Sequence, residues 1–199
     1  MIPADISILT DRLRLRRFSK ADIPFVFSAS RFEGFCNGMR WSPPETVDEL
    51  IAPYEANEQA WKSGAGYTFT IEDKTTSEPL GRISIRHQGG LLWDLGFWIH
   101  PLHQRQGFMT EATIALIDYG FLELGPSEIQ AAHATWNVAS RRVLERAGLS
   151  FIKHVPEGFQ KNGQWIEKDL HSITLQQWEK RTEQGACTQP SVAKAPSGE

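Results

Sequence analysis

The pattern of apolar and polar residues predicts two kinds of element along this chain. Strand-like stretches occupy residues 12–16, 67–72, 80–85, 92–99, 129–135, 151–159 and 165–175. In several of them apolar and polar side chains alternate, as they do on a strand that buries one face. The last two stretches flank Asn162-Gly163, a pair that favours the tight turn of a hairpin. The sequence thus predicts six to seven strands.

Helical signals fill the gaps between these strands. Capping-box sequences open segments at residues 19–30 and 46–62, and apolar side chains repeat at helical spacing in residues 108–124. A further short helix is expected between Asn137 and Ala147. The order of elements, β-α-α-β-β-β-α-β-α-β-β, predicts an α/β fold in which about four helices flank a mixed sheet.

Length and composition place these elements in one domain. The chain has 199 residues, of which 40% are hydrophobic, and large apolar side chains become scarce from residue 180 onward. We therefore expect a single domain over residues 1–179, followed by a polar, flexible tail over residues 180–199.

Charge, cysteine content and hydropathy narrow the surroundings of this domain. The net charge is −3, so neither nucleic acid nor a membrane is expected as a partner. The arginines between residues 12 and 17 alternate with leucines, which predicts the solvent-facing side of a strand. Two cysteines do not make a disulfide framework, and no apolar run is long enough to span a bilayer. We expect a cytoplasmic protein.

The polar turn at residues 100–107 carries the first chemical signal. It connects the strand expected at residues 92–99 to the helix expected at residues 108–124, and it contains one glycine, Gly107. The first N–H groups of a helix lack internal partners, and the helix dipole places about half a positive charge there. This position suits the phosphate or pyrophosphate group of a ligand.

Four stretches of the chain share a recognisable order and spacing. They are Leu9-Thr10-Asp11-Arg12-Leu13-Arg14-Leu15-Arg16, Asp94-Leu95-Gly96-Phe97-Trp98-Ile99, Gln106-Gly107-Phe108-Met109-Thr110-Glu111-Ala112, and Asn137-Val138-Ala139-Ser140 followed by Leu144-Glu145-Arg146-Ala147-Gly148-Leu149. In this order they resemble the GCN5-related N-acetyltransferases (GNAT), and most of all the RimJ/RimL-type ribosomal-protein N-terminal acetyltransferases. The resemblance covers residues 10–178, which is nearly all of the expected domain.

This resemblance implies a GNAT fold with acetyl-CoA as cofactor. The sheet would be mostly antiparallel and splayed between its fourth and fifth strands, so that the backbone near Trp98 and Ile99 pairs with the pantetheine arm. Gly107 is the one residue of the turn expected to need the conformational freedom of glycine, and Asn137 is equally suited to cap a helix. The cofactor-binding residues implied are Trp98, Ile99, Gln104, Arg105, Gln106, Gly107, Phe108, Met109, Thr110 and Asn137.

Two catalytic residues are expected. By resemblance, Ser140 protonates the departing CoA thiolate, and the alternative is a serine that simply faces solvent. Asp94 is the candidate base, acting through a water molecule, which requires that burial raise its pKa. The alternative for Asp94 is a carboxylate that pairs with an arginine at the edge of a strand.

The sequence says less about the acceptor. The loop at residues 32–41 and two tryptophans, Trp41 and Trp93, are the candidates to line its pocket, and core packing is the alternative for both tryptophans. No metal is expected, because no carboxylate or cysteine completes a ligand set with His100 and His103.

Together these observations predict an N-acetyltransferase that moves the acetyl group of acetyl-CoA to a primary amine by direct attack in a ternary complex. The favoured acceptor is the α-amine of a protein N-terminus, because its pKa near 8 lies well below the value of about 10.4 for lysine. Two alternatives stay open: the same chemistry on a small-molecule amine such as an antibiotic or metabolite, and a non-catalytic acyl-CoA-binding module. The chain is expected to be a monomer or a homodimer.

Overall fold

One mixed sheet runs through the molecule. The computed structural model describes residues 2–184 and 191–194. Within these residues the sheet has nine strands in the order β7-β8-β6-β5-β4-β3-β2-β1-β9, and β5 and β6 form its parallel pair. The strands are β1 (Ile6–Leu9), β2 (Leu13–Arg17), β3 (Gly66–Asp73), β4 (Pro79–Gly89), β5 (Leu92–Ile99), β6 (Glu128–Ala134), β7 (Ser150–Lys161), β8 (Gln164–Thr174) and β9 (Ser191–Lys194).

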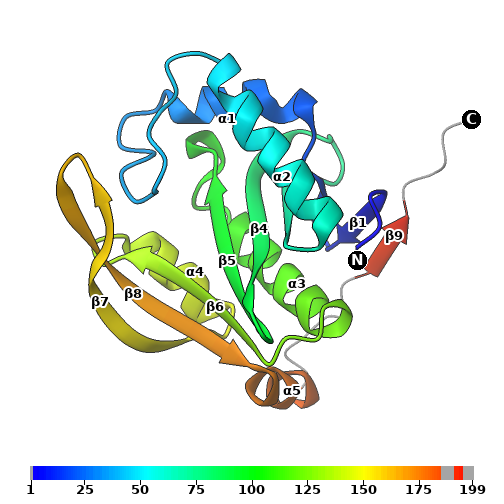
Figure 1. Ribbon diagram of the computed structural model, residues 1–199. Coiled ribbons are helices and arrows are strands. Elements are labelled where there is room, and N and C mark those ends of the chain that lie inside the picture. Colours follow the sequence, from blue (N-terminus) through cyan, green and yellow to red (C-terminus); the bar gives the residue numbers. More distant parts are fainter. Residues whose placement is uncertain (1, 185–190, 195–199) are drawn as a thin grey trace, which may run out of the picture.

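Helices cover both faces of this sheet (Figure 1). One face lies under α1 and α2, and the opposite face lies against α3 and α4, while α5 follows β8 at the lower end of the view. The described residues contain no helix with the length and apolar character that a membrane span requires. The helix bounds are α1 (Ile23–Ser30), α2 (Ile51–Ser63), α3 (Phe108–Glu123), α4 (Val138–Arg146) and α5 (Leu175–Glu183).

The expected α/β fold is confirmed, and the expected strands and helices shift by only a few residues. Three elements were not expected: β1, β9 and α5. The two helices with capping-box sequences also begin later than expected, because short 3-10 helices at Lys20–Asp22 and Asp48–Leu50 precede α1 and α2.

The helix α5 begins with a capping box that is visible in the sequence. The backbone N–H of Gln177 donates to Thr174 Oγ1 at 3.3 Å, and the backbone N–H of Thr174 donates to Gln177 Oε1 at 2.8 Å. In the last turn, Arg181 pairs at 2.6 Å with Asp118, which is buried on α3. The helix therefore continues past the expected end of the domain, and residues 191–194 of the expected tail form β9 beside β1.

The arginines and leucines of β2 alternate between the two faces of the sheet, and the arginine side chains are partly exposed to solvent. Arg14 and Arg16 both bind Glu72, whose side chain is almost fully buried on β3. Arg16 also binds Asp22 at 2.6 Å. The expected solvent face thus also carries a network of ion pairs, in which each buried carboxylate has an arginine partner.

The parallel strands β5 and β6 separate part-way along their length. Their pairing runs from Leu92 and Glu128 to Leu95 and Ala131, and both strands continue for several more residues. Beyond this point β5 stays hydrogen-bonded to β4, and β6 stays hydrogen-bonded to β8. Each strand stays paired with its outer neighbour, so the sheet is splayed at the place that the resemblance implied.

Candidate functional site

A cavity of about 1110 Å³ lies between the separated ends of β5 and β6. Residues 32–35 and 37–39, from the loop after α1, line it on one side of the sheet, and residues 103–110 and α4 line it on the other. Successive side chains of a strand point to opposite faces, so β5 contributes Trp98 on one side and Ile99 on the other. The cavity therefore connects the two faces of the sheet.

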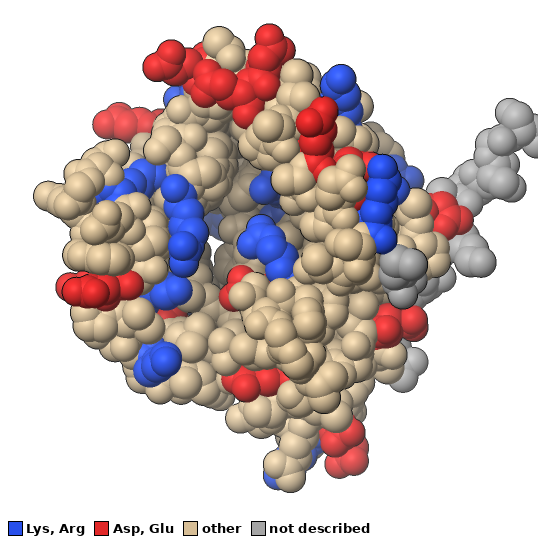
Figure 2. Space-filling view, in the orientation of Figure 1, with Lys and Arg blue, Asp and Glu red and all other residues tan. Residues whose placement is uncertain are grey.

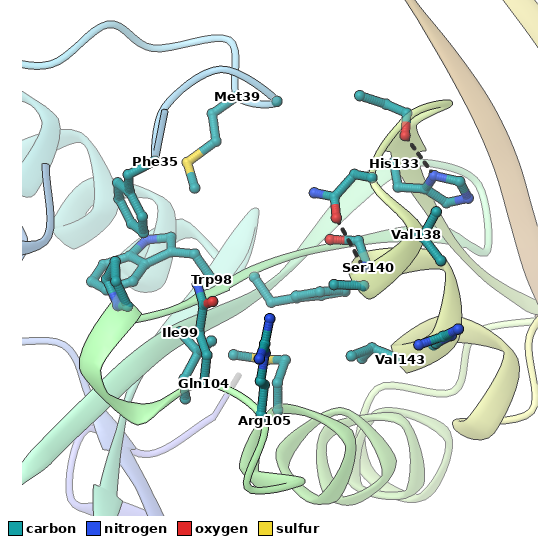
Figure 3. Close-up of a pocket in the computed structure, with 18 of the residues that line it drawn as sticks. Phe35, Met39, Trp98, Ile99, Gln104, Arg105, His133, Val138, Ser140 and Val143 are labelled. Atoms are coloured by element: carbon teal, nitrogen blue, oxygen red, sulfur yellow. Dashed lines mark hydrogen bonds between the residues drawn. The ribbon is translucent and has the colours of Figure 1, made fainter. Parts of the chain in front are cut away.

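The structure brings together all the residues that the resemblance implied in cofactor binding. Each of them lines this cavity, and so does Ser140. Figure 3 shows Phe35 and Met39 of the loop facing the cavity from one side, Trp98 from β5, and Ser140 and Val143 from α4 across from them. Asp94, Trp41 and Trp93 lie outside the lining.

The turn before α3 has the backbone of an anion site. Arg105 and Gly107 both have positive φ, 64° and 80°, and α3 begins directly after Gly107. Within the described residues no side chain caps this helix, so its first N–H groups are available to a ligand in the cavity. A side chain at position 107 would have room beside Arg12. Glycine is therefore favoured there by the positive φ and not by a lack of space.

Arg12 and Glu111 fix this turn against β2. Glu111 accepts hydrogen bonds from Thr10 Oγ1 at 2.6 Å, from the Arg12 backbone N–H at 3.0 Å and from Arg12 Nε at 2.7 Å. Arg12 Nη1 also donates to the carbonyl oxygen of Gln106 at 3.0 Å. Burial would raise the pKa of Glu111, but these hydrogen bonds outweigh it and hold the pKa below its usual value. Glu111 is thus a structural carboxylate.

Asn137 and Ser140 stand where β6 passes into α4. Asn137 Oδ1 accepts a hydrogen bond from the backbone N–H of Ser140 at 3.0 Å, so Asn137 caps α4. The hydroxyl group of Ser140 lies on the first turn of that helix and in the lining of the cavity. The structure therefore places a proton donor at the far wall from Trp98.

Asp94 lies on β5 just before the strands separate. Its register partners are Arg86 on β4 and Gln130 on β6. Burial raises the pKa of Asp94, although the positive charges of Arg86, Lys168 and Arg40 oppose the shift. The sequence left open that the carboxylate of Asp94 pairs with an arginine. Within the described residues, however, no Lys or Arg nitrogen lies within 4 Å of this carboxylate.

The two candidate tryptophans of the acceptor pocket have different surroundings. Trp93 is 7% exposed in the main core, where its ring stacks on Tyr67 at 6.1 Å between centroids. Trp41 is half-buried and meets Phe35 edge-on at 6.1 Å. Phe35 lines the cavity, so Trp41 supports the wall of the cavity from behind, whereas Trp93 packs in the core.

Lys161 holds the loop in place, which the sequence did not indicate. Its ammonium group donates to the carbonyl oxygens of Cys36, Met39 and Trp41. The tip of the β7–β8 hairpin thereby bridges to a loop more than a hundred residues away in the chain. No local pattern in the sequence could have revealed this contact.

His100, one of the two histidines considered for metal binding, forms hydrogen bonds within the fold. His100 Nδ1 accepts a hydrogen bond from the Leu102 backbone N–H, and His100 Nε2 lies 3.3 Å from Ser28 Oγ. In the part of the chain that the structure describes, no three His, Cys, Asp or Glu side chains gather as a metal site would require.

Comparison with known proteins decides the family. Residues 12–150 match the family model of the acetyltransferase (GNAT) domain. The chain belongs to the GNAT acetyltransferase family. This acetyltransferase is similar to the uncharacterized N-acetyltransferase YoaA of Bacillus subtilis, with 27% identity over 82% of this chain and 94% of that protein.

Solved structures share the fold of this acetyltransferase. The RimL ribosomal L7/L12 α-N-protein acetyltransferase in complex with CoA superposes with a TM-score of 0.76 and 16% identity, over 84% of this chain and 97% of that one. The spermidine N-acetyltransferase from Vibrio cholerae, in complex with CoA and spermine, has a TM-score of 0.74 and 22% identity, over 85% of this chain and 99% of that one.

The family assignment makes the protein an acetyl-CoA-dependent N-acetyltransferase. It argues against the alternative of a non-catalytic acyl-CoA-binding module. The cavity of this acetyltransferase suits the cofactor chemically. The uncapped start of α3 and the positive φ of Gly107 suit a diphosphate, and Arg105, Arg142 and Arg146 add positive charge to the same lining.

The substitution Gly107→Ala tests whether the turn binds the diphosphate. A β-carbon disfavours φ near +80°, so the turn relaxes and its N–H groups lose their direction. We expect the Kd for CoA, measured by isothermal titration calorimetry, to rise about 10-fold, which corresponds to about 1.4 kcal/mol.

Gly125→Ala is the matched control, because Gly125 has φ of 63° just after α3 and no neighbour within 4 Å of an added β-carbon. It should leave the Kd for CoA unchanged. Equal Kd values for CoA in the two variants would contradict the assignment.

The substitution Asp94→Asn tests the candidate base. General base catalysis contributes about 10² or more to a rate, so kcat should fall about 100-fold, while the KM for acetyl-CoA stays similar. Because the pKa of Asp94 is raised, wild-type kcat should fall as the pH drops through that raised value, above the ordinary value of about 3.9. This acid limb should be missing from the pH profile of the variant, which should keep only the limb that deprotonation of the acceptor amine imposes near pH 8.

Asp169→Asn is the control, because it removes a carboxylate on β8 that hydrogen-bonds His154. This variant should retain the wild-type kcat and the acid limb of the pH profile. An Asp94→Asn enzyme with wild-type kcat and the same acid limb would remove Asp94 from the mechanism.

Proposed function

We propose that this acetyltransferase acetylates an α-amine, above all that of a protein N-terminus, by direct attack in a ternary complex. The observation that carries the proposal is the cavity that passes through the sheet between β5 and β6. A cofactor held against the start of α3 and an amine that enters past residues 32–39 reach the same gap from opposite faces. The thioester and the amine can therefore meet without a covalent carrier on the protein.

The described cysteine supports direct attack. Cys36 is 2% exposed, and burial raises the pKa of its thiol, so the nucleophilic thiolate is disfavoured. Cys36 also lies outside the lining of the cavity. Cys187 belongs to the residues that the structure does not describe.

We assign roles to the residues of the cavity on this basis. The backbone of Trp98 and Ile99 pairs with the pantetheine arm, and the diphosphate rests on the turn from Gln104 to Thr110, with Asn137 at the thioester end. Acetyl-CoA supplies the activated acetyl group. The amine nitrogen bonds to the carbonyl carbon of that group as the bond from carbon to sulfur breaks.

The proton transfers follow from two side chains. Asp94 takes the amine proton through a water molecule, and the raised pKa of Asp94 makes it a better base than an exposed aspartate. Ser140, which faces the gap from α4, returns a proton to the CoA thiolate.

An α-amine suits these groups better than a lysine side chain. At neutral pH about a tenth of an α-amine is already uncharged, whereas lysine costs on the order of 3 kcal/mol more to deprotonate. A moderate base such as Asp94 is sufficient to deprotonate an α-amine, but it is too weak to deprotonate a lysine side chain efficiently. The RimL neighbour is an α-N-protein acetyltransferase by its name, which agrees with this choice.

A small-molecule amine is the second candidate. Lys161 forms hydrogen bonds to the loop at residues 32–41 and holds it over one side of the cavity. The path by which the acceptor enters the cavity is therefore narrower. Such an approach admits the end of a flexible chain, and it equally admits a small amine. The spermidine N-acetyltransferase neighbour shows that this fold accommodates small acceptors.

A peptide experiment separates these possibilities. Two peptides of one sequence are compared at pH 7, one with a free N-terminus and no lysine, the other N-terminally blocked with one internal lysine. We expect acetylation of the free α-amine, with kcat/KM about 100-fold above that of the lysine peptide, since the lysine is far less often neutral. The product is quantified by mass spectrometry.

An amino-acid amide serves as the small-molecule arm of the same experiment. A higher kcat/KM for the amide than for the peptide would favour the small-molecule acceptor. Equal acetylation of the lysine peptide would contradict the α-amine proposal.

A further inference from the structure

Several cationic side chains lie beside the acceptor side of the cavity, although the chain as a whole has a net charge of −3. Figure 2 shows a hollow between the α1–α2 region and the β7–β8 hairpin, with Lys and Arg side chains inside it and on its rim. Many Asp and Glu side chains of this view gather at its upper edge instead. Arg86, Lys168 and Arg40 all act electrostatically on Asp94 beside this hollow.

The register of β4 and β5 places two arginines on the acceptor face. Arg82 lies opposite Trp98, and Arg86 lies opposite Asp94, with the pair Ser84 and Gly96 between them. All of these residues share one face of the sheet, because side chains on a strand alternate. This is the face under α1, since the ring of Trp98 stacks on Phe25.

Gly96 brings Arg86 to the edge of the cavity. Gly96 lines the cavity, and a β-carbon at that residue would lie 3.6 Å from both terminal nitrogens of Arg86. The absence of a side chain leaves the guanidinium group against the cavity wall. An acceptor seated beside Trp98 is therefore within reach of this guanidinium group.

Arg82 lies deeper and has no counter-charge. Its guanidinium carbon is 5.2 Å from the centre of the Phe18 ring, and in the described residues it makes no ion pair or hydrogen bond. Burial and the positive charge of Arg86 together lower the pKa of Arg82 to about 10. A partly buried cation whose charged neighbour is another cation is unfavourable unless a ligand supplies the anion.

Another strand of the same sheet shows that this arrangement is specific to β4. On β2, Arg14 and Arg16 are matched by Glu72 and Asp22, which are both buried. The fold thus supplies carboxylates to the arginines that hold it together, whereas no carboxylate of the described residues is bonded to Arg82 or Arg86.

Trp98 adds a neutral donor to the same place. Its side chain is 7% exposed, lines the cavity, and has an indole N–H without a hydrogen-bond partner in the described residues. An indole nitrogen only donates hydrogen bonds, and buried donors are normally paired. Trp98 therefore leaves one unpaired donor beside the two arginines.

We propose that the acceptor carries an anionic group, a carboxylate or a phosphate, close to its reactive amine, and that Arg82 and Arg86 bind this group. The inference rests on the proposed amine acetylation at the same cavity. The guanidinium group of Arg86 lies over Gly96, so an anion that it binds sits at that residue. Two residues along a strand span about 6.6 Å, so an amine beside Trp98 lies about that far from the anion. In a protein acceptor this is an acidic side chain beside the N-terminus, and in a small acceptor it is the molecule's own carboxylate or phosphate.

The same charges also select against cationic acceptors. A polyamine acceptor would be repelled by Arg82 and Arg86.

The test compares three peptides that differ only at the second residue, which is aspartate, asparagine or lysine. We expect kcat/KM to be at least 10-fold higher for the aspartate peptide than for the asparagine peptide, and lowest for the lysine peptide. The preference should shrink as salt is added. Similar kcat/KM values for the three peptides, together with similar values for phosphoserine amide and serine amide, would overturn the inference.

The two amides identify the source of the anion. A preference for phosphoserine amide over serine amide that exceeds the peptide preference supports a small anionic acceptor. A larger preference among the peptides supports an acidic protein N-terminus. Either result supports the anionic group itself.

Variants connect the preference to the arginines. Arg86→Gln should raise the KM for the aspartate peptide at least 10-fold and bring its kcat/KM down to that of the asparagine peptide, while Arg86→Lys should keep much of the preference. Arg82→Gln should act in the same direction, and the circular dichroism spectrum and the Kd for CoA show whether it folds. Lys62→Gln, which removes an exposed charge at the end of α2, is the control and should keep the wild-type preference. An unchanged preference in Arg86→Gln would contradict the assignment.

Binding without turnover separates this inference from the proposed function. The peptides are titrated into the CoA-bound protein by isothermal titration calorimetry. Tighter binding of the aspartate peptide with no acetylation of any α-amine would reject the proposed function and keep the anion site. Acetylation of all peptides with equal Kd and kcat/KM would keep the function and reject the anion site.

Discussion

The divergence of β5 from β6 is the constraint on which the rest of the structure depends. The two strands share a parallel ladder only as far as Leu95 and Ala131, after which each remains bonded to its outer neighbour. A continuous ladder would bury this backbone and close the sheet. Because the ladder stops, backbone groups of β5 face a gap, and the cavity joins the two faces. Three features line the cavity at this gap: the turn before α3, Ser140 and the loop at residues 32–39.

The polar groups around the gap are divided between structure and chemistry. Glu111 is fully engaged by Thr10 and Arg12, and it keeps the turn before α3 in its conformation. Asp94 sits among positive charges without a close ion pair, and burial raises its pKa. The first arrangement holds the backbone of a cofactor site rigid, while the second leaves a carboxylate able to exchange a proton.

Local patterns in the sequence were sufficient for most of the fold. Alternation identified the strands of the central sheet, and the strand–turn–helix pattern around Gly107 located the turn with its positive φ. The capping box at Thr174 was equally local, and it would have predicted α5. The short strand β1 and its partner β9 lack such a signal, since their pairing joins opposite ends of the chain.

Contacts between distant parts of the chain could not be predicted in this way. The contact of Lys161 with the loop spans more than a hundred residues, and nothing near Lys161 indicates it. Trp41 and Trp93 looked alike in the sequence, but only the packed sheet places Trp93 beside Tyr67 and Trp41 behind Phe35. The surroundings of the arginines could not be predicted either. Alternation indicates which face of the sheet Arg14 and Arg82 lie on, but it does not indicate whether a carboxylate lies opposite each of them.

A crystal structure of the protein with bound CoA tests the central claim most directly. The account predicts the diphosphate at the backbone N–H groups between Arg105 and Thr110, and the pantetheine arm hydrogen-bonded to β5 in the gap beside β6. CoA bound outside the gap, or β6 closed onto β5 along Gly96 to Ile99 with CoA elsewhere, would contradict it.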